Sequence, residues 1–256
     1  MVERSPWQQL QIVQALRFVA EDPRWHEKLG LAAVIAMVPV LNFALTGYRV
    51  SLIRNVADGR DLPLPEWRDV TGLWWQGLPL ALATWIYAAP MLLVLAAGAV
   101  FTVAALAVAD AGGDPWVALG AVGLVAVVGM LFLGAYGLAL SLVRPTLEIQ
   151  YAREGTFASC FAWGTMLGAI RRNFEGYAVL WLALFAARTL TSTVLSPIIS
   201  TLSAIPAIGQ LLTMVVVALV YTYLGLAAAH LEGQLLGADE AAVSEHPPPE
   251  PLPQPA

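Results

Sequence analysis

The positive charges of this chain are confined to three short segments, and this pattern restricts the possible fold more than any other feature. Twelve of the thirteen lysines and arginines lie within residues 1–28, 48–75 and 144–176. Between and after these segments, the chain is apolar over stretches longer than the roughly 18 residues that cross a bilayer as a helix. Basic loops alternating with apolar spans are typical of a multi-pass protein of the cell membrane with those loops in the cytoplasm. We therefore predict an all-α, polytopic membrane protein whose main partner is the lipid bilayer.

Composition agrees with this fold class. Only 12% of the 256 residues are charged and 59% are hydrophobic, whereas roughly a quarter of the residues in soluble domains are charged. Because the basic residues flank apolar segments, we expect no nucleic-acid partner.

Four apolar stretches predict full spans within a helical membrane domain of residues 29–237. Residues 1–28 contain no continuous apolar core, and we expect them to form an amphipathic segment at the bilayer surface. Residues 238–256 are polar and rich in proline, and we expect a disordered tail in the cytoplasm. The predicted full spans are residues 78–109, residues 116–143, a span that begins near residue 177, and residues 208–230.

The first apolar run, residues 29–48, is interrupted by Pro39, which removes a helix hydrogen bond and clashes with the preceding turn. The run therefore predicts either a kinked span or a re-entrant hairpin that returns both of its ends to one face. A hairpin places all twelve loop cations on one side and none on the other, whereas a kinked span divides them eight against four. Charge counting thus favours the hairpin, which requires neighbouring elements to cover its backbone.

Two polar residues within apolar runs form a candidate intramembrane site. Arg188 lies eleven residues beyond Tyr177, and Asn42 lies close after the break at Pro39. Near the bilayer centre an arginine costs several kcal/mol unless it is paired or hydrated. Arg188 and the Ser- and Thr-rich segment after it would then line a hydrated cavity for an anion or a lipid headgroup. The alternative, which we favour, is a short span from which Arg188 extends toward the membrane surface.

Small residues recur at every fourth position near the end of the last span. Such a stripe lets two helix backbones approach closely, either within one chain or in a homo-oligomer or a complex with another membrane protein. The candidate packing face is Gly225, Ala229, Gly233 and Gly237.

Three arginines of the basic segment 144–176 are candidates for binding anionic lipid headgroups. Basic residues near a membrane surface contribute about 1 kcal/mol each to such binding. The alternative, which we favour, is ordinary anchoring by positively charged loops. The residues are Arg153, Arg171 and Arg172.

Several segments together carry a family resemblance. They are EDPRWHEKLG, VPVLNFALTGYRVSLIRNVADGRDLPLPEW, QYAREGTF and IPAIGQLLT, followed by YLGLAAAHLEGQLLG. In this order and spacing, over about residues 12–237, the chain resembles the prokaryotic membrane-protein family catalogued as domain of unknown function 4013. The resemblance implies a small polytopic helical protein and no particular activity. Arg188 departs from the apolar character expected of its segment.

The sequence predicts no catalytic residue, no cofactor and no metal site. It contains no phosphate-binding loop, no nucleophile elbow and no HExxH motif, and its single cysteine, Cys160, precludes an intrachain disulfide. We expect a non-enzymatic module that acts as a membrane scaffold, a lipid-organising protein or an accessory subunit. One alternative is a small transporter or channel for an anion or lipid with a cavity near Arg188. The least favoured is a membrane enzyme acting on lipids.

Overall fold

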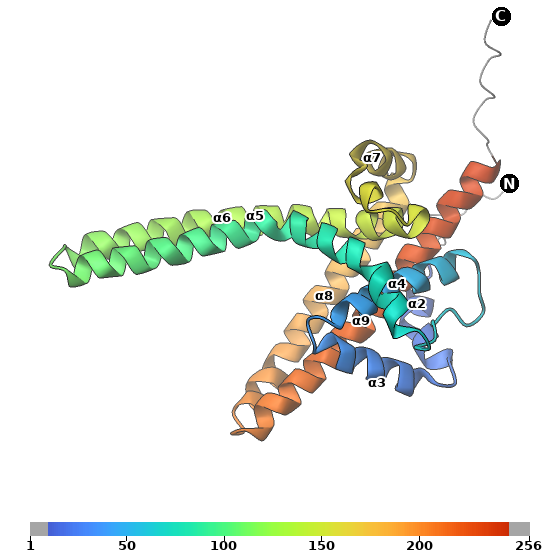
Figure 1. Ribbon diagram of the computed structural model, residues 1–256, viewed down its shortest axis with the longest axis horizontal. Coiled ribbons are helices and arrows are strands. Elements are labelled where there is room, and N and C mark those ends of the chain that lie inside the picture. Colours follow the sequence, from blue (N-terminus) through green and yellow to red (C-terminus); the bar gives the residue numbers. More distant parts are fainter. Residues whose placement is uncertain (1–9, 246–256) are drawn as a thin grey trace, which may run out of the picture. The chain divides into compact units, whose positions relative to one another are not determined.

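The computed structural model describes residues 10–245, and these residues form helices joined by turns and one longer loop (Figure 1). The predicted all-α fold is confirmed. The elements are α2 (Ile12–Glu21), α3 (Trp25–Ala36), α4 (Asn42–Ala57), α5 (Val70–Asp110), α6 (Pro115–Glu154), the 3₁₀ helix η1 (Phe157–Phe161), α7 (Trp163–Arg172), α8 (Phe174–Ser203) and α9 (Ile208–Glu245).

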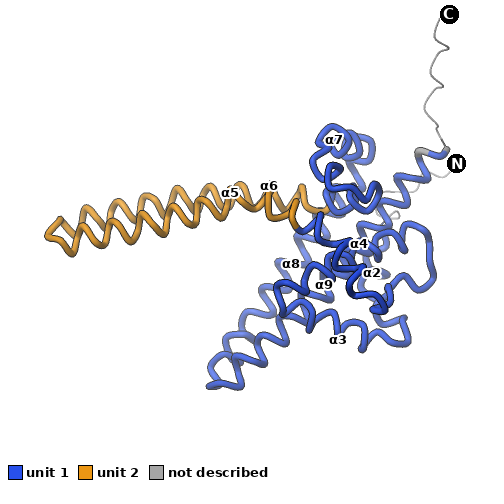
Figure 2. The backbone as a smooth tube through the Cα atoms, viewed as in Figure 1, with its two compact units in different colours: residues 1–81, 146–256 blue, residues 82–145 orange. Residues whose placement is uncertain are grey.

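The chain divides into two compact units (Figure 2). Unit 1 contains the described residues up to 81 and from 146 onward, and unit 2 contains residues 82–145. The long helices α5 and α6 contribute turns to both units, and every other described helix belongs to unit 1.

Four described helices are long and apolar enough to cross a membrane: α5, α6, α8 and α9. They contain the four predicted full spans. The shortest of them, α8, has 30 residues and is therefore about 45 Å long at 1.5 Å per residue. Each helix is thus longer than the roughly 30 Å of hydrocarbon in a bilayer and has additional turns for the polar interface.

The first apolar run forms two short helices, α3 and α4, rather than one kinked span. The 12 residues of α3 extend about 18 Å, which is too short to cross a bilayer. Residues 37–41, which include Pro39, form the turn at which the chain reverses direction (Figure 1). The first turn of α3 and the loop after α4 then meet, and the Lys28 ammonium donates to the carbonyl of Leu64 at 3.1 Å. The structure therefore shows a helical hairpin in place of one kinked helix, and its re-entry into the membrane stays a prediction.

The core of unit 1 forms where α9 packs against α2, α3, α4 and α8. Close helix packing here depends on glycine. A Cβ atom at Gly233 would lie 2.6 Å from the carbonyl oxygen of Ile53 in α4. Where α4 crosses the first turns of α5, a Cβ on either Gly47 or Gly77 would overlap the backbone of the other helix. These positions accept no larger residue without movement of a helix.

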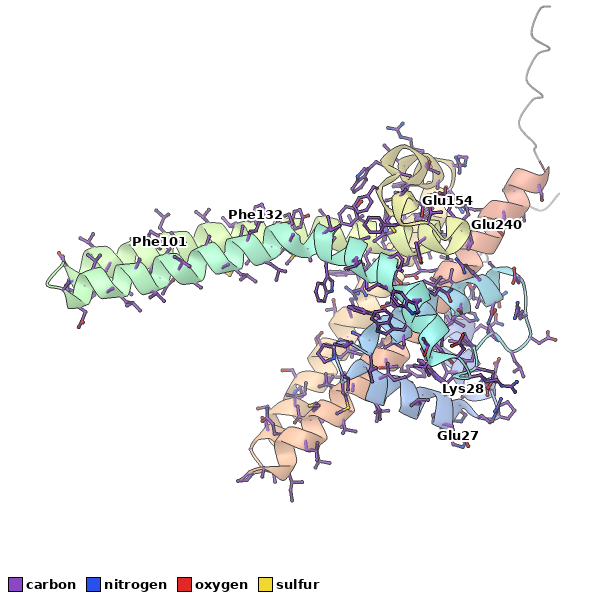
Figure 3. The ribbon with its side chains drawn as sticks, in the orientation of Figure 1. Glu27, Lys28, Phe101, Phe132, Glu154 and Glu240 are labelled. Atoms are coloured by element: carbon purple, nitrogen blue, oxygen red, sulfur yellow. The ribbon has the colours of Figure 1, made fainter. Side chains whose placement is uncertain are left out.

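Unit 2 is a pair of antiparallel helices, the central parts of α5 and α6. The tyrosine hydroxyl of Tyr136 donates to the carbonyl of Tyr87 at 2.7 Å. No residue in the most apolar stretch of either helix is buried, and the side chains project outward from the pair, as Figure 3 shows for the region of Phe101 and Phe132. An apolar surface of this kind requires lipid or another apolar chain around it.

The expected start of the disordered tail at residue 238 is corrected by the structure. Helix α9 continues through Glu245, eight residues beyond Gly237. Asp239 explains the extension: it is buried and accepts hydrogen bonds from Arg153 at 3.4 Å and from Asn173 at 3.2 Å. The remainder of the predicted tail, residues 246–256, lies outside the described residues, as does the start of the amphipathic segment, residues 1–9.

Candidate functional site: charged clusters in unit 1

A first group of charges, the Lys28 cluster, joins the start of α3 to the loop after α4. It consists of Asp22, Arg24, Lys28 and Glu66. The Lys28 ammonium lies 2.7 Å from the carboxylate of Asp22 and 2.8 Å from that of Glu66, and Lys28 is only 7% exposed. Arg24 pairs with the same Glu66 oxygen at 2.6 Å from a more exposed position. A buried lysine requires partners of this kind, since an isolated charge in the interior is costly.

The loop that supplies Glu66 is held against α4 by its prolines and its tryptophan. The rings of Tyr48 and Trp67 stack with centroids 4.2 Å apart. The Tyr48 hydroxyl donates to the carbonyl of Pro65 at 3.0 Å, and the Asn55 amide donates to that of Pro63 at 2.8 Å. The Leu-Pro-Leu-Pro-Glu-Trp corner therefore forms one wall of the Lys28 cluster.

Both acids of the Lys28 cluster are held in the charged form. Burial alone would raise the pKa of Asp22, but the hydrogen bonds from Lys28 and from the backbone amide of Arg24 together lower it below its ordinary value of 3.8. The hydrogen bond from Lys28 lowers the pKa of Glu66 below 4.5, against a smaller opposing effect of burial. Such acids are poor proton donors near neutral pH, so the arrangement suits a structural ion pair better than acid–base chemistry.

A second pair of charges joins α4 to the last turns of α6. The guanidinium of Arg49 forms a short ion pair with Glu148, which is only 4% exposed. One turn further along α4, the Nε of Arg54 donates to the carbonyl of Ala152 at 2.8 Å. These contacts bridge residues 99 and 98 positions apart in the chain.

Arg153 does not extend freely to the membrane surface. It pairs with Asp239 of α9 at 3.4 Å, and its side chain is 23% exposed. Asp239 in turn binds Asn173, the residue that caps α8 by accepting from the amide of Gly176 at 3.2 Å. Of the three predicted headgroup contacts, Arg153 is thus engaged within the protein, whereas Arg171 and Arg172 are exposed at the end of α7.

The two residues of the predicted intramembrane site lie on different helices and are both exposed: Asn42 begins α4, and Arg188 lies in the middle of α8. Helices α8 and α9 are antiparallel, with Gly176 beside Leu235 and Leu202 beside Gly209.

This register places Arg188 level with Tyr223 on α9. The Tyr223 hydroxyl donates to the backbone of Leu16 in the amphipathic helix α2. Arg188 therefore lies at the level of an amphipathic helix rather than near the apolar turn between α8 and α9.

The predicted packing face on α9 is directed at α4 within the same chain. Ala229 is fully buried, and a Cβ on Gly237 would lie 3.1 Å from the carbonyl oxygen of Ala57. A Cβ on Gly225 would lie 3.8 Å from the Nε of Arg49, so the stripe also makes room for this partly buried arginine. Intramolecular packing therefore accounts for the stripe.

Metal and thiol chemistry find little support in the described residues. No group of three or more His, Cys, Asp and Glu residues between residues 10 and 245 could hold a metal ion. Cys160 is fully buried, and burial raises the pKa of its thiol to about 11. A thiol with such a pKa is almost entirely protonated near neutral pH and is a weak nucleophile.

Sequence reasoning missed the charged clusters, although it quoted several of their residues. Asp22, Arg24 and Lys28 stand in EDPRWHEKLG, and Glu66 stands in LPLPEW. Both segments carry the family resemblance, and each places charged residues next to an apolar run. Opposite charges in these two segments were the available sign that they pair with one another. The pairing of Glu148 and of Asp239 with distant arginines had no local signal.

Comparison with known proteins gives a family and no relative of known function. The family described as "Protein of unknown function (DUF4013)" matches residues 30–203, which is more than half of the chain and excludes α9. No curated protein and no solved structure matches the chain. With four helices able to span a membrane among its described residues, this chain belongs to the DUF4013 family, whose function is unknown.

Proposed function

We propose that this protein is a non-enzymatic membrane scaffold, in which unit 1 is a rigid anchor and unit 2 offers an apolar surface to lipids or to another membrane chain. The observation that carries the proposal is the complete lack of buried residues in the most apolar stretches of α5 and α6. Two helices whose most apolar stretches bury nothing enclose no pathway there by themselves. It suits lateral contact within the bilayer.

The use of the charged residues in unit 1 supports a scaffold rather than an enzyme. Lys28 binds Asp22 and Glu66, and Arg49 binds Glu148. Each of these contacts fastens one helix or loop to another. A lipid-modifying enzyme requires acids, bases or nucleophiles that converge on a substrate, whereas these five charged residues are engaged with one another.

The transporter alternative depends on Arg188 and makes a different prediction. The exposed position of Arg188, level with Tyr223, favours a side chain that extends to the membrane surface over one that lines a hydrated path. A scaffold requires no anion or lipid movement, whereas a transporter of this design loses its activity when Arg188 is replaced.

Reconstituted liposomes distinguish the two functions. We expect chloride efflux, phosphate efflux and lipid scrambling at the rates of protein-free liposomes, both for the unaltered protein and for Arg188→Leu. Fluorescence energy transfer between labelled copies, or to a candidate partner, then measures lateral association. Flux that disappears in a folded Arg188→Leu protein would replace the scaffold by a transporter.

We also propose that the basic loops face the cytoplasm. The contact between Lys28 and Leu64 supports a shared side for the first two basic segments, because it joins the start of α3 to the loop after α4. The positive-inside rule then favours the cytoplasm as that side. In the Cys160→Ala protein, single cysteines at Asp58, in the loop after α4, and at Gly112, in the turn between α5 and α6, test it in intact cells. An impermeant thiol reagent is expected to label position 112 and to spare position 58; the reverse pattern contradicts the orientation.

A further inference from the structure

Helix α7 presents three different faces along its ten residues. Met166 and Ala169 are buried in unit 1. Trp163 and Leu167 are 51% and 46% exposed. A third face carries glycine, threonine and arginine. A helix with one face against protein, one exposed apolar face and one polar face is typical of a helix that lies in a membrane interface.

The exposed apolar face ends in a positive charge. Trp163, Leu167 and Arg171 follow one another at intervals of four residues, so they form one stripe along the helix. Arg172 is the next residue, and both arginines are exposed. A long arginine side chain at the edge of an apolar stripe can reach a phosphate while its methylene groups remain on the apolar surface.

The charge of α7 is exclusively positive. The helix contains no acidic residue, and in the part of the chain that the structure describes neither arginine forms an ion pair. The nearest acid along the chain is Glu175, in the first turn of α8, where the helix dipole favours a negative charge. The arginines are therefore available to an anion outside the protein.

The connection to α8 fixes where α7 lies. Only Asn173 separates α7 from α8, one of the four helices able to cross the membrane. The Asn173 side chain accepts from the amide of Gly176 and donates to Asp239. Both hydrogen bonds of Asn173 are made within unit 1, so Asn173 holds α7 directly beside the start of a membrane helix. The apolar environment nearest to α7 is therefore the bilayer.

We propose that α7 recognises lipids. Trp163 and Leu167 enter the boundary between headgroups and acyl chains, in the membrane leaflet on the side of the basic loops. Arg171 and Arg172 bind the headgroups of anionic phospholipids. The proposal does not depend on the scaffold function.

Helix α2 provides an internal comparison. It also has a buried face, formed by Ala15 and Phe18, and an exposed apolar face that includes Val13. Its one arginine, Arg17, is accompanied by Glu21, so α2 has no net charge. We expect α2 to bind the membrane without preference among headgroups, and Arg17 is therefore a matched control for the arginines of α7.

The first test measures where α7 lies. The full-length Cys160→Ala protein is placed in nanodiscs, with a nitroxide label at Leu167→Cys or at Thr165→Cys, which is exposed on the polar face. We expect the label at position 167 to collide with oxygen, which concentrates in hydrocarbon, and the label at 165 to collide with a water-soluble nickel complex. Equal exposure of both labels to nickel overturns the proposal.

The second test measures headgroup preference. A fluorophore at position 167 is quenched by nitroxide-labelled phosphatidylglycerol or phosphatidylcholine in nanodiscs of which about a third of the lipid is anionic. Each arginine is expected to give about a fivefold preference for phosphatidylglycerol, or about thirtyfold for the two. Arg171→Gln/Arg172→Gln should abolish this preference, Arg171→Lys/Arg172→Lys should retain most of it, and Arg17→Gln should leave it unchanged. Equal quenching by both lipids in the unaltered protein, or a preference that survives the double glutamine variant, overturns the proposal.

Discussion

Unit 1 and unit 2 are both helical, but different interactions specify them. In unit 1, ion pairs and buried hydrogen bonds join segments that are far apart in the sequence, such as Arg49 and Glu148, 99 positions apart. In unit 2, the most apolar stretches of the described helices bury nothing, and the hydrogen bond from Tyr136 to Tyr87 joins the two helices. A membrane chain can therefore fix one part of its structure through internal polar contacts and leave the other to be defined by its surroundings.

The largest expected difference concerns the buried ion pair. Glu148→Ala leaves the partly buried guanidinium of Arg49 without its carboxylate and should lower the free energy of unfolding by up to about 3–5 kcal/mol, the range for a fully buried pair. Unfolding in detergent micelles, followed by circular dichroism, measures the loss. Arg60→Ala is the control, because its pair with Asp58 is 60% exposed on both sides and should contribute less than about 1 kcal/mol. Equal losses in the two variants would show that the buried pair is not a major support of unit 1.

Glycine replacements compare the two units directly. Gly47→Ala forces a methyl group into the backbone of α5 and should cost about 3 kcal/mol or more in the same unfolding measurement. Gly134→Ala adds a methyl group where nothing lies within 4 Å, and the lower entropy of the unfolded alanine chain should leave stability unchanged or slightly higher. A stability loss at Gly134 as large as that at Gly47 would contradict the exposed state of unit 2.

Acid should weaken unit 1 through the Lys28 cluster. The folded-state pKa values of Asp22 and Glu66 lie below their ordinary values of 3.8 and 4.5. Their contribution to stability is therefore complete above these ordinary values and is lost as the pH falls through the lowered ones. The midpoint of the unfolding transition should decrease once the pH is below about 4. The decrease should be smaller in the Lys28→Met variant. An identical pH profile in that variant would remove the Lys28 cluster as its cause.

The smallest expected difference involves single hydroxyl groups. Tyr48→Phe leaves the carbonyl of Pro65 without its donor in a partly buried site and should cost about 1–2 kcal/mol. Tyr136→Phe removes a comparable bond in unit 2, where such bonds between membrane helices average about 0.6 kcal/mol. Unfolding both variants under the same conditions compares their losses in free energy of unfolding. A larger loss for Tyr136→Phe than for Tyr48→Phe would contradict the expected difference between the two units.

The spans could be predicted from the sequence because their information is local. An apolar run of sufficient length identifies a membrane helix, and the four runs correspond to α5, α6, α8 and α9. Pro39 likewise lies in the turn that separates α3 from α4, so the break in the first apolar run could be predicted from one residue. These features depend on composition and on neighbours along the chain.

The remaining features depend on residues that meet only after folding. The polar composition after Gly237 indicated a tail, yet Asp239 finds Arg153 and Asn173 and extends α9 to Glu245. Arg153 is a candidate headgroup contact in the sequence because its partner, Asp239, lies 86 residues away and is not evident from neighbouring residues. Charges in a membrane protein cannot be assigned to lipid or to protein until the distant partner is known.

The central claim is that apolar surroundings define unit 2, whereas unit 1 is defined by contacts within the chain. Nitroxide labels on single cysteines at Val100 and Leu131 in unit 2, and at Leu52 and Ile53 in unit 1, test this claim in nanodiscs of the Cys160→Ala protein. The first two positions are 70% and 68% exposed, and the other two are fully buried. We predict frequent collisions with oxygen and few with a water-soluble nickel complex at 100 and 131, and few with either at 52 and 53. Frequent nickel collisions at positions 100 and 131 would contradict the account.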